Sequence, residues 1–152
     1  MPDFSKRRVA ALIRKTRRVV PDNIRYVKEM GKEIDKINMF FTDMEARKRM
    51  RVSLGQIPGI LVTSSIPNNL EINAAGADKG SALLRLAEFL GIGREETMAF
   101  GDGENDLSML RAAGLGVAME NGEEQVKQAS DFVTVSNNDA GVASAIRKFV
   151  LE

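Results

Sequence analysis

Between residues 34 and 75 the hydrophobic positions change from alternation to helical spacing. Ile37, Met39 and Phe41 lie on one side of an expected strand. Asp43 is suited to cap the helix that follows. The apolar stripe of that helix consists of Ala46, Met50, Leu54 and Ile57. Its charged positions predict a solvated face: Glu45, Arg47, Lys48, Arg49 and Arg51.

Two short apolar runs follow, over residues 60–66 and 70–74. Pro67, Asn68 and Asn69 separate them, and such residues favour the tight turn of a hairpin. The segment 34–75 therefore predicts the order β-α-β-β, with a helix on one side of an open-faced sheet.

From residue 76 onward, apolar runs and helical stripes alternate regularly. We expect helices at 83–90, 105–113, 123–129 and 141–151, and strands at 97–101, 115–119 and 131–135. Strands separated by helices of this length are typical of a parallel, doubly wound sheet. The chain is thus predicted to be α/β, with a Rossmann-like sheet in residues 76–152.

The first 33 residues differ in charge from the rest. They carry a net charge of +6 and the remainder −5, which together give the overall +1. An amphipathic helix is expected to end before Pro21, with a short second helix, residues 24–30, ended by Gly31. The basic residues in the range 6–18 could contact nucleic acid, but a solvated helix face is the commoner origin of such a pattern.

Composition narrows the classes of protein and of site. Hydrophobic residues make up 43% and charged residues 28% of the chain, as in globular proteins. No apolar run approaches the roughly 20 residues that span a bilayer, and the basic start lacks the apolar core of a signal peptide. We therefore expect a soluble, cytoplasmic protein. Because cysteine and histidine are absent, oxygen must hold any metal, which favours magnesium over zinc.

Acidic and amide side chains gather where the expected strand 97–101 gives way to a helix. They are Asp102, Glu104, Asn105 and Asp106. Open α/β sheets bind ligands at such turns. The mutual repulsion of these carboxylates is relieved by a cation, so the turn predicts a divalent-metal site.

The acidic turn is also compatible with a structural role, but two familiar ligand-binding motifs do not fit it. Asp102 or Asn105 could cap the following helix, a role compatible with metal binding. An EF-hand calcium loop is excluded because Leu107 and Ala113 occupy the positions of its glycine and closing glutamate. A dinucleotide-binding turn is excluded because Asp106 stands where its third glycine belongs.

The motif Gly101-Asp-Gly-Glu-Asn-Asp106, preceded by Lys79 at the start of a helix, resembles the haloacid dehalogenase superfamily, and most of all its Cof-type phosphatases. The resemblance runs from about Ile34 to the C-terminus. It includes Asn68-Asn69-Leu-Glu-Ile, Gly114-Leu-Gly-Val-Ala-Met119 and Asp131-Phe-Val-Thr-Val-Ser136. It implies that residues 34–75 are part of an α/β cap and that residues 76–152 are the C-terminal half of the core.

The resemblance also implies roles for four residues. Lys79 would act in catalysis by steadying the phosphoryl group and the nucleophile, and Asp102 would bind Mg²⁺. Asp106 would complete the metal site and act with Lys79 in catalysis, while Asn105 would help Lys79 to bind the substrate. A lysine at a helix N-terminus is suited to bind a phosphate anion. Magnesium would neutralise part of the negative charge of the phosphate from the other side.

The family's nucleophile motif, Asp-x-Asp, is absent from the chain. No two aspartates are separated by a single residue: Asp3, Asp22, Asp35, Asp43, Asp78, Asp102, Asp106, Asp131 and Asp139. In the family the strand that bears the nucleophile lies beside the strand 97–101, so we expect that strand to be an exposed edge. The chain is expected to be a C-terminal fragment, a truncated reading frame, or one half of a split protein.

We expect the parent protein to hydrolyse the phosphate monoester of a small phosphorylated metabolite with Mg²⁺, and the isolated chain to be catalytically incomplete. A second chain, or self-association, is expected to cover the exposed edge. The alternatives are a non-catalytic module for phosphate binding or assembly, and a nucleic-acid contact through residues 6–18.

Overall fold

The computed structural model describes Lys15 and residues 17–152. The chain divides after Ile34 into two units, and each is described by itself. Most of the expected first helix, and most of the basic range 6–18, lies outside the described residues. Residues 17–20 are not helical, so the helix expected to end before Pro21 does not include these four residues.

The first unit contains one described helix, α2 (Asn23–Met30). Asp22 caps it by accepting a hydrogen bond of 2.9 Å from the backbone N–H of Arg25. Gly31 ends it in the left-handed conformation, with φ of 61°. The Arg18 guanidinium lies 5.3 Å from the centre of the Tyr26 ring. The expected second helix and its terminating glycine are confirmed.

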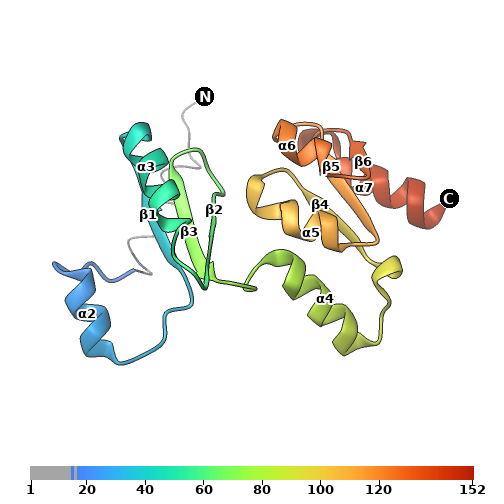
Figure 1. Ribbon diagram of the computed structural model, residues 1–152. Coiled ribbons are helices and arrows are strands. Elements are labelled where there is room, and N and C mark those ends of the chain that lie inside the picture. The colour runs from blue at the N-terminus through green and yellow to red at the C-terminus, as the bar shows by residue number, and fades with distance from the viewer. Residues whose placement is uncertain (1–14, 16) are drawn as a thin grey trace. The chain divides into compact units, whose positions relative to one another are not determined.

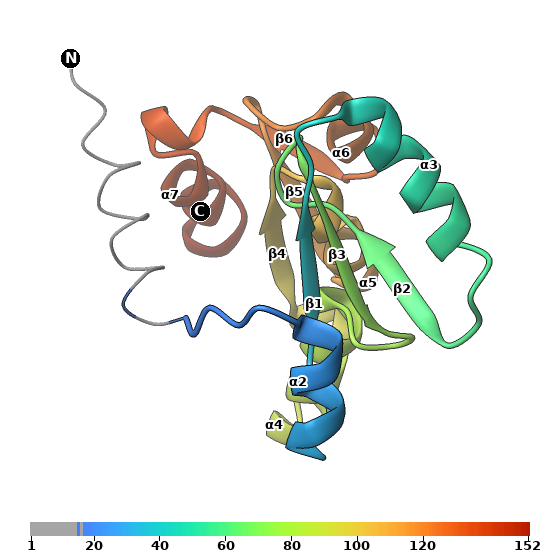
Figure 2. The same cartoon turned by 90° about the vertical axis from the view of Figure 1, so that its left-hand side faces the viewer.

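The second unit begins with an antiparallel sheet, which we call the antiparallel lobe (residues 35–75). Its elements are β1 (Ile37–Phe40), α3 (Met44–Leu54), β2 (Ile60–Thr63) and β3 (Asn69–Ala74). The strand order is β1-β3-β2, and α3 lies along one face of the sheet (Figures 1 and 2). Asp43 caps α3 through the N–H groups of Glu45 and Ala46, as expected. The β-α-β-β order is confirmed.

The register of this sheet places polar side chains together on one face. Glu71 of β3 is paired with Asn38 of β1 and with Thr63 of β2. Asn73 lies two residues further along β3 on the same face. The strand expected over 60–66 ends at Thr63 instead.

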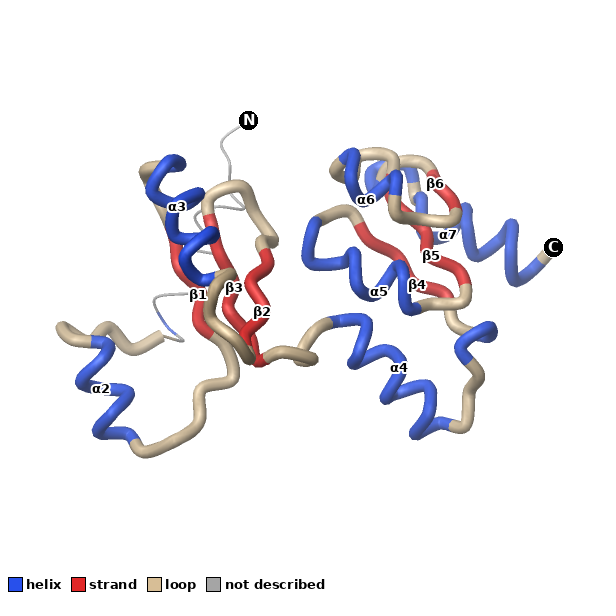
Figure 3. Tube along the Cα trace, viewed as in Figure 1, coloured by secondary structure: helices blue, strands red, loops and turns tan. Residues whose placement is uncertain are grey.

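The parallel lobe (residues 76–152) alternates helices and strands, as Figure 3 shows by colour. Its main elements are α4 (Lys79–Leu90), β4 (Met98–Gly101), α5 (Leu107–Ala112), β5 (Leu115–Met119), α6 (Glu124–Gln128), β6 (Phe132–Thr134) and α7 (Gly141–Ile146). A 3-10 turn (Glu104–Asp106) precedes α5, and a π-helical turn (Arg147–Leu151) follows α7.

The sheet of this lobe is parallel with the order β4-β5-β6, which confirms the predicted Rossmann-like alternation. Within the described part of the chain, β4 pairs only with β5 and is therefore an edge strand. Among the described helices, none is long and apolar enough to cross a membrane.

The hydrophobic core lies in the parallel lobe. Its buried members are Ala99, Leu110, Ala113, Ala118 and Val126, with Leu83, Leu107 and Met109 packed against them. Helix α4 packs against α5, and Gly80 lies directly against the backbone of Ser108. A Cβ atom added at Gly80 would collide with the backbone oxygen of Ser108, so a side chain there would force the helices apart.

Candidate functional site

The predicted site lies at the carboxyl end of β4, where the chain turns sharply into α5. Gly101, the last residue of β4, is buried against Asp106. A Cβ atom at position 101 would lie 2.5 Å from the Cβ of Asp106. Glycine is therefore required here if the Asp106 side chain is to fold back over the end of the strand.

Asp106 is the centre of the hydrogen bonding at this turn, and only 5% of its surface is exposed. One carboxylate oxygen pairs with the ammonium group of Lys79. The other accepts hydrogen bonds from the N–H groups of Asp102, at 3.0 Å, and Gly103, at 3.2 Å. Burial opposes ionisation, but the hydrogen bonds from Lys79, Asp102 and Gly103 outweigh it and lower the pKa of Asp106.

Lys79 is the first residue of α4, and the start of that helix is firmly capped. Asp78 accepts hydrogen bonds from the N–H groups of Gly80, at 2.9 Å, and Ser81, at 3.0 Å. The bond from the Ser81 backbone contributes most to lowering the pKa of Asp78, and the hydroxyls of Ser108 and Ser81 add to it. The Lys79 side chain remains 48% exposed. Asp106 thus holds the Lys79 ammonium group in place, while the side chain remains accessible to a ligand.

The remaining predicted residues are Asp102 and Asn105. Asp102 is exposed and forms no ion pair among the described residues, whereas Asn105 lines a pocket. In the described part of the chain, no three acidic side chains converge as a ready metal site. The all-oxygen donors suit magnesium, with Asp102 as the accessible carboxylate. Both oxygens of Asp106 already accept hydrogen bonds, so its role as a metal ligand stays a prediction.

Glu104, the third acidic residue of this turn, pairs with a residue of the antiparallel lobe. Arg51 of α3 donates two hydrogen bonds to its carboxylate, one of them at 3.0 Å, from Nη1 to Oε2. Only 19% of the Glu104 side chain is exposed. This hydrogen bonding, together with the opposite charge, raises the pKa of Arg51 despite its partial burial.

Two arginines of α3 depart from the expected solvated face. Besides the contact of Arg51 with Glu104, Arg47 donates hydrogen bonds of 2.9 Å to the backbone oxygen of Asn69 and to the hydroxyl of Ser64. The prediction that the charges of this helix are merely solvated is therefore wrong for these two. Their spacing of four residues puts them on one stripe of the helix, which was the available signal.

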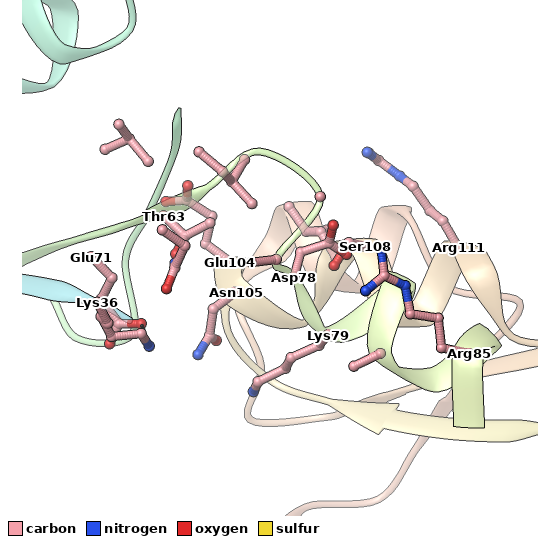
Figure 4. A pocket seen from close by; sticks show the side chains of 17 residues that line it. Lys36, Thr63, Glu71, Asp78, Lys79, Arg85, Glu104, Asn105, Ser108 and Arg111 are labelled. Atoms are coloured by element: carbon pink, nitrogen blue, oxygen red, sulfur yellow. Dashed lines mark hydrogen bonds and ion pairs between the residues drawn. The ribbon is translucent and has the colours of Figure 1, made fainter. Parts of the chain in front are cut away.

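A pocket of about 680 Å³ adjoins the turn (Figure 4). The parallel lobe contributes Asp78, Lys79, Arg85, Glu104, Asn105, Ser108 and Arg111, among others. The antiparallel lobe contributes Lys36, Leu61, Val62, Thr63, Glu71 and Asn73. In Figure 4 the side chains of Lys79 and Asn105 project toward the same side of the pocket.

The wall formed by the antiparallel lobe carries an ordered ion pair that sequence reasoning missed. The ammonium group of Lys36 donates a hydrogen bond of 2.7 Å to Glu71. Burial raises the pKa of Glu71, but the bonds from Lys36, Ser65 and Asn69 prevail and lower it. The two partners are 35 residues apart, so no local pattern indicates the pair. The wall is therefore charged and hydrogen-bonding at neutral pH.

Comparison with known proteins identifies the family. The family model of haloacid dehalogenase-like hydrolases matches residues 5–146. The chain belongs to this family. The parallel sheet β4-β5-β6 is accordingly part of its Rossmann-like core, and the resemblance to Cof-type phosphatases is confirmed.

Individual relatives agree with this assignment. The chain is 42% identical over 109 residues to a 5-amino-6-(5-phospho-D-ribitylamino)uracil phosphatase, YcsE, of Bacillus subtilis, a match that covers 72% of this chain and 44% of that protein. A haloacid dehalogenase-like hydrolase of B. subtilis matches with a TM-score of 0.73 at 37% identity, over 81% of this chain and 45% of its own. The phosphatase BT1666 of Bacteroides thetaiotaomicron matches with a TM-score of 0.74 at 31% identity. This match covers 100% of this chain and 54% of that protein. The chain thus spans about half the length of these relatives.

The structure brings most of the predicted haloacid dehalogenase site residues together. Lys79 contacts Asp106, Asp106 accepts the N–H of Asp102, and Lys79 and Asn105 line one pocket. The functional candidates that sequence reasoning missed are Arg51 and the Lys36–Glu71 pair. Their partners are distant in the sequence, so only the fold shows them.

Proposed function

We propose that this chain supplies the phosphate-binding and magnesium-binding half of a phosphatase that hydrolyses phosphate monoesters of small metabolites. The observation that carries the proposal is the Lys79–Asp106 pair at the carboxyl end of β4, anchored by the N–H groups of Asp102 and Gly103. An ammonium group at a helix N-terminus, held in place by the acidic turn, is suited to bind a phosphoryl group.

Each residue has a proposed part in binding. Lys79 donates to phosphoryl oxygens, and Asp106 holds its ammonium group in place. Asp102 is the residue that would hold Mg²⁺, which when bound shares the negative charge of the phosphoryl group. Asn105 adds an amide to the same end of the pocket. Because the cation and the ammonium group approach one anion from different residues, loss of either should weaken phosphate binding.

The wall of the pocket formed by the antiparallel lobe is suited to bind a polar leaving group. Lys36, Thr63, Glu71 and Asn73 offer donors and acceptors in the pocket that Lys79 also lines. YcsE is named for a phosphorylated ribityl compound, a small molecule with several polar groups. We propose substrates of that general kind, small phosphorylated metabolites, in place of macromolecules.

No pair of aspartates in this chain matches the nucleophile motif of the family. Without an oxygen nucleophile no covalent intermediate forms, and water alone would have to attack phosphorus. We therefore propose that turnover requires the complementary core strands, supplied by another polypeptide or another segment. They would pair with the edge of β4.

The decisive assay is turnover of a generic aryl phosphate with magnesium, by the chain alone and after mixing with a polypeptide that carries the missing core strands. We expect negligible turnover alone and restored turnover in the mixture, abolished by Lys79→Ala and by Asp102→Ala. Lys48→Ala, an exposed lysine outside the pocket, is the matched control. Robust turnover by the pure chain would show that the chain contains a nucleophile other than the Asp-x-Asp motif.

Magnesium binding provides a test that does not depend on activity. Calorimetry should detect weak binding, because Asp102 is the one accessible carboxylate at the turn and the family's second carboxylate ligand is absent. Asp102→Ala should remove this binding, while Asp35→Ala should leave it unchanged. Equal affinity in the wild type and in folded Asp102→Ala would exclude Asp102 as the metal ligand.

The absence of a nucleophile also favours a second candidate function, a phosphate-binding or assembly module without catalysis. The mixing experiment separates the two. A mixture that binds phosphate at Lys79 but never turns over the ester would favour the module.

A further inference from the structure

Most charged side chains that line the pocket have a counterpart within the described chain. Asp78 serves as the N-cap of α4, because its carboxylate accepts hydrogen bonds from the N–H groups of Gly80 and Ser81. Other charged residues of the pocket form ion pairs, which are Lys36 with Glu71, Lys79 with Asp106, and Glu104 with Arg51. These charges are therefore engaged within the protein itself.

Arg85 and Arg111 line the same pocket without such a counterpart. Neither guanidinium group forms an ion pair or a hydrogen bond within the part of the chain that the structure describes. Arg85 lies on α4 and Arg111 on α5, and these two helices pack against each other. Two like charges on adjacent helices repel each other unless an anion neutralises them. The two arginines are thus the cations of the pocket that no described carboxylate pairs with.

The two arginines lie some distance along the helices from the proposed phosphate-binding residue. Lys79 is the first residue of α4, and Arg85 follows six residues later, about 9 Å along the helix axis. Arg111 lies one turn of α5 beyond Ser108, whose backbone meets the start of α4 at Gly80. In Figure 4 the side chains of both arginines extend from these helices at the edge of the pocket.

The size of the pocket allows one ligand to reach both places. Its volume of about 680 Å³ lies in the range of sites that bind small metabolites. A guanidinium group presents its N–H donors in a planar fork, which matches the two oxygens of a carboxylate or phosphate. A neutral hydroxyl group takes up only part of this hydrogen bonding and none of the charge. The arginine end of the pocket is therefore best suited to an anion.

We propose that Arg85 and Arg111 bind a second anionic group of the ligand whose phosphate lies at Lys79. This inference rests on the proposed phosphate site. It narrows the substrates from small phosphorylated metabolites in general to those that also carry a carboxylate or a second phosphate. The two arginines are then specificity-determining residues, since they contact a part of the substrate that does not react.

Ligands with the same six-carbon chain test this assignment by calorimetry in magnesium buffer. Sorbitol 6-phosphate ends in a hydroxyl group at its first carbon, 6-phosphogluconate in a carboxylate, and sorbitol 1,6-bisphosphate in a second phosphate. The wild type should bind at least one of the doubly anionic ligands about tenfold more tightly than sorbitol 6-phosphate, the effect of about one charge-assisted hydrogen bond. The ligand with the higher affinity identifies the second group as carboxylate or phosphate.

Variants locate the origin of this preference. Arg85→Ala and Arg111→Ala should each reduce it to about threefold, and the double variant should abolish it. Their affinity for sorbitol 6-phosphate should stay at the wild-type value, which also shows that they fold. Arg49→Ala removes the same charge from an exposed position outside the pocket and should keep the full preference. If an alanine variant does not fold, Arg85→Gln and Arg111→Gln retain most of the side chain and should show the same losses.

The outcomes separate this inference from the proposed function. Equal affinity of the wild type for all the ligands would overturn the inference and leave the phosphate site standing. A preference that survives in the folded double variant, or that falls equally in Arg49→Ala, would also overturn it, because the arginines would then not form the site. A wild type that binds none of the ligands would instead reject the proposed phosphate site, and this inference with it.

Discussion

The two lobes of the second unit are stabilised by different kinds of contact. In the parallel lobe the buried side chains are mainly apolar: Ala87, Ala99, Leu110, Ala113, Val117, Ala118, Met119, Val126 and Ala145. In the antiparallel lobe Leu70 is the one buried hydrophobic residue among those described. The buried polar residues Ser64, Asn69 and Glu71 surround it in the sequence.

Each lobe is therefore vulnerable to a different kind of change. Apolar burial is non-directional and adds up over many contacts. A polar network is directional, and a single lost partner leaves its neighbours unsatisfied. We expect the parallel lobe to unfold as a unit and the antiparallel lobe to open locally at lower cost. The pocket has one wall from each, so its shape depends on the less stable lobe.

The largest effect should come from the apolar core. Leu110 is 1% exposed, and Leu110→Ala should destabilise the parallel lobe by about 3 kcal/mol because it leaves a cavity. Leu84→Ala, at a position that is 40% exposed, is the matched control and should cost well under half as much. Chemical denaturation measures both. Equal costs would mean that Leu110 is not part of a close-packed core.

The next effect concerns the polar network. The amide oxygen of Asn69 accepts hydrogen bonds from the N–H groups of Ser65, at 3.1 Å, and Ile66, at 3.2 Å, and its nitrogen donates to Asn38, at 3.2 Å. Asn69→Ala should cost about 2 kcal/mol, because buried donors and acceptors lose their partner. Hydrogen exchange should speed up in the antiparallel lobe only.

Asn73 provides the control for that experiment. It lies on the same strand as Asn69 but lines the pocket. Asn73→Ala should leave amide exchange nearly unchanged. If exchange in the parallel lobe rose equally with Asn69→Ala, the two lobes would not differ in the way proposed.

The smallest effect is expected at Asp106, and it depends on pH. Since the folded protein lowers the pKa of Asp106, its charge stabilises the fold at neutral pH, and this contribution disappears as the pH falls below the usual carboxyl range near 4. Asp106→Asn should cost about 1 kcal/mol at pH 7 and less at pH 2, where protonation of the carboxylate in the folded state removes part of the contribution. Urea denaturation at both values checks this, with exposed Asp139→Asn as the control. A cost that did not change with pH would exclude charge as its cause.

Local signals account for what the sequence could predict. Asp43 and Gly31 were expected at helix ends, where they lie, because capping involves neighbouring residues. The alternation in residues 76–152 predicted a parallel sheet, and the strand end at 97–101 predicted a site at the acidic turn, to which the family resemblance added Lys79. Topology rules connect such residues without detailed coordinates.

Contacts between distant residues account for what it could not predict. The strand expected to reach residue 66 ends at Thr63 because Asn69 binds the backbone of Ser65 and Ile66 and turns the chain. Arg51 was assigned to a solvated face because its partner, Glu104, lies 53 residues away. Hydrophobic periodicity shows which face of a helix is apolar, but not which charge meets a partner across the fold.

The contact of Gly80 with Ser108 has a consequence for reading mutational data. Gly80 binds no ligand in the proposed site, yet any side chain there would collide with the backbone of α5 and displace Lys79, its neighbour in the chain. In a library of single substitutions, position 80 should therefore tolerate nothing but glycine and would resemble a catalytic position by that measure. Thermal unfolding would tell the two apart, since a substitution that spaces the helices lowers stability even when phosphate is absent.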